Sequence, residues 1–412
     1  MASSSRPVVL GYDAVSPLGT TLEEQWERSL AGESGVGPLH RFPLRKDFPV
    51  RIAGEVPPCD FGGDPCLSPR RLAPWSSPVF AHGILVARRA VARAGVPMTE
   101  EVRCRTAVTF GTAVGGLDAV IAADRALVKH GSLPKPWANP NSCINMPTGA
   151  VAIALEATGP IVNPATACAT GATSIALGAL MLESGAADLA VCGAVDFALV
   201  EPIVAGFATM NGAYKSRPGE DPTTVSRPFG EGRAGFVVAE GAAALVLGTP
   251  AFARRHRLEP ICTLAGWAMN ADAFKPVAPR RETVARCMQL ALHHAGCQAA
   301  EVSAVSAHAA STVVGDRVEA EALSDVFGCQ PPPVTALKSQ TGHMMGASSG
   351  VETVFAIEGM VRGLLPPTLN YSRDVEFAVD AVAEPRKLHQ DVVLKNAFGF
   401  GGANTCLVFT RR

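Results

Sequence analysis

The stretch Asn163-Pro-Ala-Thr-Ala-Cys-Ala-Thr-Gly-Ala172 joins an apolar run typical of a strand to a run that predicts a buried helix. The preceding run, Gly159-Pro-Ile-Val162, indicates the end of a strand. The following run, residues 169–185, is rich in Ala, Leu, Ile and Met, with Gly and Ser where packing must be close. We therefore expect Cys168 at a helix N-terminus, where unpaired N–H groups and the helix dipole stabilise a thiolate over a thiol.

Three later motifs carry further candidate residues. Two of them contain a histidine and the third is rich in glycine. They are Ser306-Ala-His308-Ala-Ala-Ser-Thr-Val-Val-Gly-Asp316, Lys338-Ser-Gln-Thr-Gly-His343-Met-Met-Gly346 and Asn396-Ala-Phe-Gly-Phe-Gly-Gly-Ala-Asn404. Each motif alone is a weak signal, because a buried cysteine is more often a small hydrophobic residue and a lone histidine is more often structural. Their joint order and spacing are specific.

The glycine-rich motif differs from a nucleotide-binding loop. It lacks GxGxxG spacing, and no acidic residue follows it to bind a ribose. We interpret it instead as a turn whose glycines let the backbone approach the cysteine.

Composition excludes several classes of protein. A net charge of −1 argues against a general nucleic-acid binder, whose affinity depends on a basic surface. The 11 cysteines lack paired spacing, so we expect reduced thiols in a cytoplasmic protein. No His or Cys cluster indicates a metal, and we expect neither a signal peptide nor a membrane span.

Short apolar runs alternate with helical stretches, which predicts an α/β protein with parallel sheets. The first helix is predicted from a capping box of Thr21 and Glu24. Leu22, Trp26 and Leu30 recur on one face of that helix. Another helix is expected over residues 347–359.

A weak internal duplication suggests two halves. One half ends in the apolar strand Gly241-Ala-Ala-Ala-Leu-Val-Leu247 and the other in Asn404-Thr-Cys-Leu-Val-Phe409. We place the boundary at the basic stretch Arg254-Arg-His-Arg257, which divides the chain into residues 1–255, with the cysteine, and 256–412, with both histidines. The halves are expected to share one core.

Together the motifs resemble the β-ketoacyl synthase family, the decarboxylating condensing enzymes, and within it the fatty-acid elongation type with a Cys-His-His triad. The resemblance runs from Val8-Val-Leu-Gly-Tyr-Asp-Ala-Val-Ser-Pro-Leu-Gly19 through Phe48-Pro-Val-Arg-Ile-Ala-Gly-Glu55 to Val408. It implies a thiolase-like α/β fold with five layers, αβαβα, built from two pseudo-symmetric halves. It also implies a homodimer that works with acyl carrier protein and needs no cofactor beyond the carrier's phosphopantetheine.

The resemblance implies roles for five catalytic residues. Cys168 accepts the acyl group, because a thiolate exchanges readily with thioesters. His308 and His343 donate from Nε2–H to the oxygen that becomes negative when malonyl loses carbon dioxide, each donor contributing roughly 3–4 kcal/mol. Lys338 and Glu352 lie buried near the histidines and tune their protonation and geometry.

The resemblance also implies a substrate site around the glycine-rich turn. There, the backbone N–H of Phe400 joins that of Cys168 in holding the acyl oxygen, and the Phe400 ring gates the acyl pocket. A second loop, Gly111-Thr-Ala-Val-Gly-Gly116, lines the same pocket. The substrate-binding residues expected are Phe400, Phe398, Val114, Thr312 and Gly401.

Two features bear on the carrier protein. Ala309-Ala310 stands where the family usually has Gly-Thr, so one hydroxyl that binds phosphopantetheine is missing, while Thr312 keeps the other. Carrier proteins are acidic, so docking is expected at cations. The candidates are Arg70, Arg71, Lys129 and Lys135.

The expected reaction is decarboxylative condensation of an acyl thioester on Cys168 with malonyl-acyl carrier protein, which makes the protein an acyltransferase of fatty acid elongation. One alternative is a ketosynthase of a specialised polyketide or unusual-lipid pathway. Another is a non-catalytic partner subunit, which the cysteine and both histidines disfavour. The second histidine motif disfavours a cysteine hydrolase. A thiolase would carry a second catalytic cysteine, whereas Cys406 is expected to be buried in the last strand.

Overall fold

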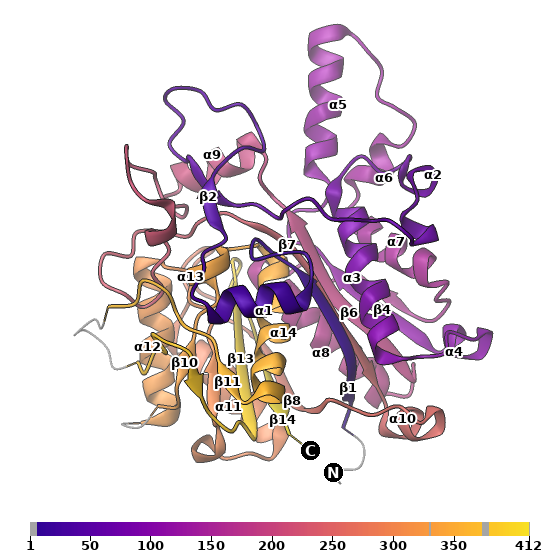
Figure 1. Cartoon of the computed structure of the whole chain (residues 1–412), viewed down its shortest axis with the longest axis vertical. Coiled ribbons are helices and arrows are strands. Elements are labelled where there is room, and N and C mark those ends of the chain that lie inside the picture. Colours follow the sequence, from indigo (N-terminus) through magenta and orange to yellow (C-terminus); the bar gives the residue numbers. More distant parts are fainter. Residues whose placement is uncertain (1–5, 329–330, 373–378, 412) are drawn as a thin grey trace.

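The computed structural model describes residues 6–328, 331–372 and 379–411 of the chain. Its largest feature is a ten-stranded sheet with the order β10-β9-β13-β14-β8-β1-β7-β6-β4-β5. The first half of the chain supplies β1 (Val8–Val15), β4 (Thr106–Gly111), β5 (Ile161–Val162), β6 (Leu189–Phe197) and β7 (Glu240–Gly248). The second half supplies β8 (Cys262–Ala271), β9 (Ala304–Ser306), β10 (Val334–Thr335), β13 (Val392–Gly399) and β14 (Ala403–Thr410). Figure 1 shows the two halves side by side.

The two sets of five strands repeat one pairing pattern. β1 and β6 pair antiparallel with β7, and β4 pairs parallel with β6 and β5. In the same way β8 and β13 pair antiparallel with β14, and β9 pairs parallel with β13 and β10. Each half is therefore mixed, and the expectation of parallel sheets is wrong for part of each half. The short turn between β13 and β14 permits only an antiparallel pair, because a parallel pair needs a long crossover.

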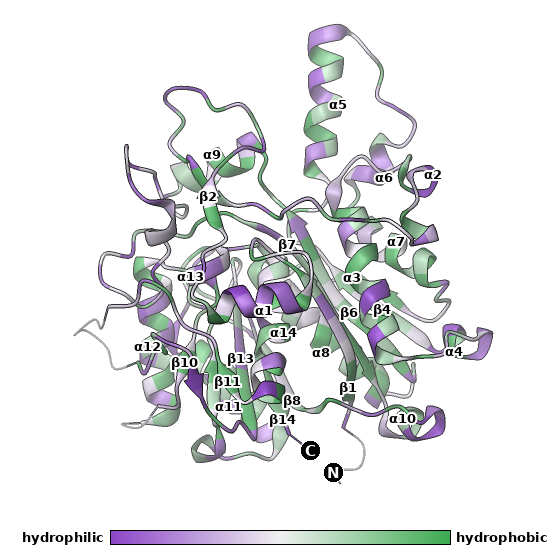
Figure 2. Cartoon of the chain, in the orientation of Figure 1, coloured by the Kyte–Doolittle hydropathy of each residue, from purple (hydrophilic) through white to green (hydrophobic). Residues whose placement is uncertain are grey.

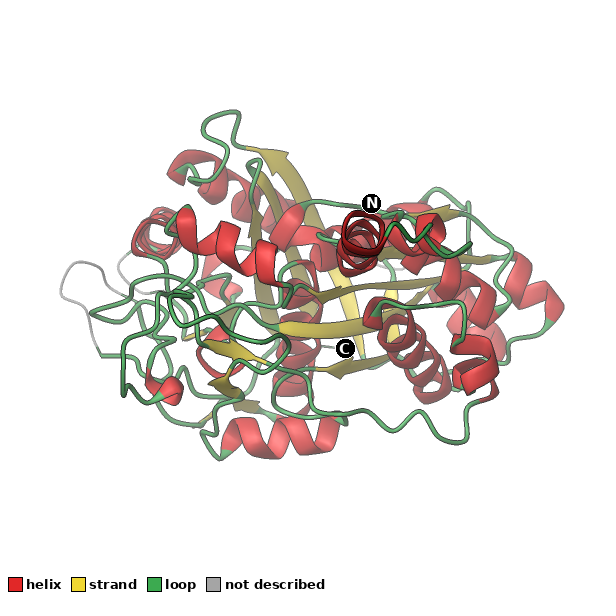
Figure 3. Ribbon diagram, turned by 90° about the horizontal axis from the view of Figure 1, so that it is seen from above, coloured by secondary structure: helices red, strands yellow, loops and turns green. Residues whose placement is uncertain are grey.

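Helices lie outside and between the two sets of strands, which gives the five expected layers. The central pair is α8 (Thr170–Glu183) and α14 (Gly346–Arg362); the outer helices are α3 (Pro78–Ala94), α7 (Met146–Leu155), α11 (Arg281–Ala295) and α12 (Val313–Phe327). α8 packs against β4, β6 and β14, and α14 packs against β6, β7 and β13. Figure 3 shows helices on both sides of the strands.

Glycine brings the two central helices into close contact. A Cβ added to Gly171 would lie 2.5 Å from the backbone nitrogen of Gly350, so a larger residue does not fit at this crossing. α8 is largely apolar (green) in Figure 2, as expected of a helix buried on all sides. Because Cys168 lies in the turn that leads into α8 and His343 lies in the turn that leads into α14, the crossing brings these two residues together.

The first helix, α1 (Leu22–Leu30), begins where the sequence predicts. The hydroxyl of Thr21 accepts the N–H of Glu24 at 3.3 Å. The Glu24 carboxylate accepts the N–H of Thr20 at 2.9 Å, one residue before the partner that a capping box requires. Trp26 lies on the buried face of this helix and packs into the core.

Shorter elements surround this core. They are α2 (Pro69–Leu72), α4 (Glu100–Cys104), α5 (Leu117–His130), α6 (Ala138–Ser142), α9 (Glu201–Thr209), α10 (Pro250–His256), α13 (Lys338–Thr341) and the strand pairs β2 (Val36–Pro38) with β3 (Ile52–Gly54) and β11 (Leu364–Leu365) with β12 (Arg386–Lys387). α5 projects from the body of the molecule in Figure 1. Within the described ranges, every helix is too short or too polar to cross a membrane.

Candidate active site

Cys168 lies in a tight turn immediately before α8. Ala167 has a positive φ of 48°, which sets the sharp change of direction into the helix. The end of β13 lies against this turn, since a Cβ added to Gly399 would be 2.2 Å from the Thr166 carbonyl oxygen. Glycine at this position therefore lets Phe400, the next residue, approach the cysteine.

The thiol of Cys168 is buried, with 6% of the residue exposed. Burial raises the pKa of the Cys168 thiol to about 11, although the charge of Lys338 and the backbone N–H of Phe400 act to lower it. The expected stabilisation of the thiolate is therefore outweighed in the resting protein. The helix N-terminus is present as predicted. However, removing water from around the sulfur destabilises the thiolate by more than the helix N-terminus stabilises it.

This raised pKa predicts how the thiol responds to pH. Alkylation of Cys168 by iodoacetamide should accelerate about tenfold per pH unit from neutral pH towards about 10, because only the thiolate reacts. The measurement is peptide mass spectrometry of the Cys168 peptide over time at each pH. The exposed Cys104 serves as the internal control. A rate at Cys168 that levels off below pH 8 would contradict the prediction.

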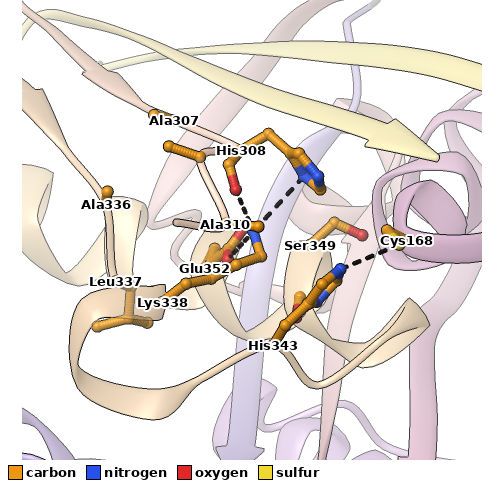
Figure 4. A network of polar contacts seen from close by, with 12 residues as sticks. Cys168, Ala307, His308, Ala310, Ala336, Leu337, Lys338, His343, Ser349 and Glu352 are labelled. Carbon is orange, nitrogen blue, oxygen red and sulfur yellow. Dashed lines mark hydrogen bonds and ion pairs between the residues drawn. The ribbon is translucent and has the colours of Figure 1, made fainter. Parts of the chain in front are cut away.

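His343 contacts the candidate nucleophile directly. Its Nε2 lies 3.0 Å from the Cys168 sulfur, as the dashed line in Figure 4 shows. Its Nδ1 lies 3.0 Å from the Ser348 hydroxyl, which can donate or accept, so Nε2 can either accept the thiol proton or carry a hydrogen. Burial, then the charge of Lys338, hold the pKa of His343 well below its usual value. The ring is therefore neutral.

His308 lies on the other side of the site, with its ring centroid 5.8 Å from that of His343. Lys338 Nζ donates to the His308 carbonyl oxygen at 2.5 Å and lies 3.5 Å from His308 Nδ1. An ammonium group has no acceptor, so Nδ1 is the acceptor and the ring hydrogen lies on Nε2. Burial and the charge of Lys338 hold the pKa of His308 well below its usual value.

Lys338 and Glu352 form a buried ion pair behind the histidines. Lys338 Nζ lies 2.6 Å from Glu352 Oε1, and each side chain is 1% exposed. Figure 4 shows this pair on the far side of His308 from the open site. The structure thus brings the five catalytic candidates together as two groups, Cys168 with His343 and His308 with Lys338 and Glu352, whose histidine rings lie 5.8 Å apart.

A cavity of about 310 Å³ opens over the cysteine. Cys168, His308, His343, Phe398 and Phe400 line its floor, and the exposed side chains Val313 and Val314 lie farther out. Phe398 is buried, and its ring centroid lies 5.6 Å from that of His308. Its position combines packing with contact to the cavity.

Of the remaining substrate-binding candidates, Thr312 lines this cavity, whereas Gly401 and Val114 are not among its lining residues. Gly401 adopts φ of 85°, and its N–H donates to the Pro276 carbonyl at 2.7 Å. Val114 and Phe400 both pack against one apolar cluster, but only Phe400 of the two lines the cavity, so the role of Val114 in the pocket wall stays a prediction. Thr312 lines the cavity, but its hydroxyl caps α12 by accepting the N–H of Gly315 at 3.2 Å.

The predicted docking cations lie elsewhere on this chain. Arg70 and Arg71 lie on α2, Lys129 is near the end of α5, and Lys135 follows it. All four are exposed and none lines the cavity, whereas Lys275 does. Cys406 is buried in β14, as predicted.

Two buried charged residues of the site were missed at the sequence level. Asp196, at the end of β6, accepts the hydroxyl hydrogen of Thr112 at 2.7 Å and the N–H groups of Ala113, Val114 and Gly346. It therefore ties the pocket loop after β4 to the start of α14. The other is Lys395 in β13, which binds Glu352. The sequence could have indicated both residues, because a charged side chain inside an apolar strand run requires a buried partner.

Comparison with known proteins gives one family. Residues 5–251 match the β-ketoacyl synthase N-terminal domain, and residues 261–372 match its C-terminal domain. A 3-oxoacyl-[acyl-carrier-protein] synthase 2 of Coxiella burnetii is 34% identical over 417 residues, which cover 98% of this chain and 98% of that protein. A β-ketoacyl synthase from Burkholderia phymatum STM815 has a TM-score of 0.92 at 29% identity, over 99% of this chain and 100% of that one. The ishigamide ketosynthase/chain length factor has a TM-score of 0.90 at 28% identity, over 100% of both chains.

These matches confirm the family, the thiolase-like fold and the acyltransferase class that the sequence predicted. The resemblance at the motifs extends over 98% of the relative from Coxiella burnetii, and the candidates Cys168, His308 and His343 line one cavity. The chain belongs to the β-ketoacyl synthase family.

Proposed function

We propose that this protein condenses an acyl group on Cys168 with malonyl-acyl carrier protein in fatty acid elongation. The observation that carries the proposal is the convergence of Cys168, His308 and His343 on one cavity. The products are carbon dioxide, a 3-oxoacyl-acyl carrier protein and the free thiol. The relative from Coxiella burnetii is named for this activity, which favours elongation over a specialised pathway.

The first half-reaction transfers the acyl group to sulfur. His343 Nε2, 3.0 Å from Sγ, takes the thiol proton, and the thiolate attacks the acyl thioester carbon. The carrier thiolate leaves and takes the proton back from the protonated His343, so the carrier departs as its thiol and the ring is neutral again. Backbone N–H groups of Cys168 and Phe400, which also act on the thiol, face the developing oxyanion.

The second half-reaction forms the carbon–carbon bond. The bond to the malonyl carboxylate breaks, carbon dioxide leaves, and its electron pair forms an enolate on the malonyl thioester. Nε2–H groups of the neutral His308 and His343 stabilise that oxygen. The enolate carbon then attacks the acyl carbon, the Cys168 thiolate leaves, and it takes up one proton from solvent to restore the free thiol.

The protein is also proposed to form a homodimer through the face that carries β5. β5 is an edge strand, and Ile161 is 53% exposed, which leaves a template for pairing with a second copy. Neighbouring segments expose further large apolar side chains, an arrangement that marks interfaces. These are Leu127, Val128, Leu133, Trp137, Ile144 and Ile153. Sedimentation velocity at micromolar concentration checks this, and a monomer would contradict it.

Three further points belong to the proposal. The halves 1–255 and 256–412 act as one folding unit, since Val8 and Val9 of β1 pair with β8 across the boundary.

The ten cysteines of the described residues are free, which suits a reducing cytoplasm. The exposed cations Arg70, Arg71, Lys129 and Lys135 are candidates for carrier docking; no resident cofactor takes part in either half-reaction.

Intact-protein mass spectrometry tests the proposed function. The protein is incubated with a panel of acyl-carrier thioesters, then with malonyl-acyl carrier protein. An acyl adduct of Cys168 that disappears as 3-oxoacyl product forms is the expected result. A protein that gains no adduct from any acyl chain, or whose adduct does not turn over, would refute the proposal.

Phe400 is expected to act as a gate that admits malonyl only after acylation. It lies between Gly399 and Gly401, which permit a backbone change. Phe400→Ala should raise the ratio of malonyl decarboxylation without acyl primer to productive condensation, measured with labelled carbon dioxide.

Phe398→Ala is the control for this gate. Phe398 is buried, so its truncation should lower the free energy of unfolding by about 3–5 kcal/mol and change the ratio less. An unchanged ratio in Phe400→Ala, with one ring position in structures with and without an acyl group, would exclude the gate.

A further inference from the structure

A second lysine is buried beside the catalytic histidines. Lys395 lies in β13 and is 0% exposed. Its Nζ is 2.7 Å from Glu352 Oε2 and donates to the carbonyl oxygens of Asn396 at 2.5 Å and Ala307 at 3.4 Å. Three ammonium hydrogens thus meet three acceptors. Protein groups therefore satisfy all three hydrogens of the Lys395 ammonium group.

Lys395 shares its carboxylate with a catalytic candidate. Lys338 Nζ lies 2.6 Å from Glu352 Oε1, so the two oxygens of one carboxylate bind two ammonium groups. A second carboxylate, Glu319, is buried nearby and interacts electrostatically with Lys395. The cluster therefore contains two positive and two negative charges, and a buried cluster is tolerated when its charges balance.

These four charges hold the backbone that carries His308. Lys395 binds the carbonyl oxygen of Ala307, and Lys338 binds that of His308. Glu319 accepts the N–H of His308 at 2.9 Å and the N–H of Ala309 at 2.7 Å. Two consecutive carbonyls are thus held by cations and two consecutive amides by an anion. The position of the His308 ring depends on all four contacts.

We infer that Lys395 is a positioning residue for the decarboxylation half-reaction, acting through Glu352, Lys338 and the backbone of His308. The inference rests on the proposed function. Lys395 is not among the residues that line the cavity, so acylation of Cys168 does not depend on it directly.

The charge of Lys395 also reaches the His308 ring. Burial is the largest cause of the lowered pKa of His308, followed by Lys338, His343 and Lys395. Removing a positive charge raises the pKa of a nearby histidine, because the protonated form is then less disfavoured. The titratable groups that face Lys395 from the elements around it are Glu352, Glu319, Lys338, His308 and Cys406, with Cys287 beside Cys406.

The first test is Lys395→Met, which keeps the length of the side chain and removes its charge. Release of carbon dioxide from malonyl-acyl carrier protein should fall by about 10- to 100-fold, the scale of a misplaced catalytic group. Acylation of Cys168 should stay within about twofold, since its own contacts are unchanged. The acid-side loss of carbon dioxide release should move to higher pH, because the pKa of His308 rises when the positive charge is removed.

A double-variant cycle separates charge from packing. Glu319→Gln removes one negative charge, and each single variant leaves one uncompensated charge in the cluster. Lys395→Met with Glu319→Gln restores balance, so its loss should be smaller than the product of the two single losses. Lys387→Met, at an exposed lysine of β12, is the matched control for the substitution itself.

Each outcome decides the inference. Unchanged decarboxylation in Lys395→Met, an equal loss of acylation and decarboxylation, or additive losses in the double variant would overturn it. If Lys395→Met does not fold, recovery of folding and carbon dioxide release in the double variant supports the charge coupling, and no recovery overturns it. A native protein that releases no carbon dioxide refutes the proposed function instead.

Discussion

Cys168→Ala is expected to lose condensation by about 10⁴-fold or more, because the covalent acyl intermediate cannot form without the sulfur. Cys168 is the one thiol among the described residues that line the cavity. The assay follows 3-oxoacyl product from an acyl-carrier thioester and malonyl-acyl carrier protein. Peptide mass spectrometry of the native protein should place the acyl group on Cys168.

Cys262→Ala is the matched control for this substitution. Cys262 is fully buried in β8, away from the lining of the cavity, so the same chemical change should leave condensation within about twofold. Full condensing activity in Cys168→Ala, or an acyl group found on another residue, would remove Cys168 from its assigned role.

The places of Cys168, His308 and the glycine turn could be predicted because each follows a short apolar strand run in the sequence. Cys168 follows β5, His308 follows β9, and the glycine turn follows β13. The carboxyl ends of such strands gather at one edge of a sheet, so residues far apart in sequence can meet there. The central helices were also predicted, since α8 and α14 are long apolar runs with glycine at their crossing.

Other features depend on contacts that the sequence does not contain. The pKa of Cys168 depends on a competition between burial and nearby charges, and only the structure shows that burial prevails. Lys395 lies one residue before the glycine-rich motif that begins at Asn396. Its proposed role nevertheless depends on Glu352, which lies 43 residues earlier in the chain. The Glu24 carboxylate accepts the N–H of Thr20 instead of that of Thr21, and this shift by one residue depends on local backbone geometry.

His308→Ala and His343→Ala are each expected to lower carbon dioxide release from malonyl-acyl carrier protein by about 10²–10³-fold, the scale of losing one oxyanion donor. Both rings are neutral, and Lys338 fixes the hydrogen of His308 on Nε2, so each can donate to the enolate oxygen. The measurement is labelled carbon dioxide release, with acylation of Cys168 followed separately by intact mass.

The two variants should differ in the acylation step. His343 lies 3.0 Å from the sulfur, whereas His308 is held by Lys338, so His343→Ala should slow acylation more while leaving it measurable. His294→Ala, a partly buried histidine beside Trp267 and outside the cavity lining, controls for loss of an imidazole. Unchanged carbon dioxide release in either catalytic variant would refute the donor role of that histidine. Equal loss of acylation in both would show that they act on the thiol, because an enolate donor has no task before malonyl binds.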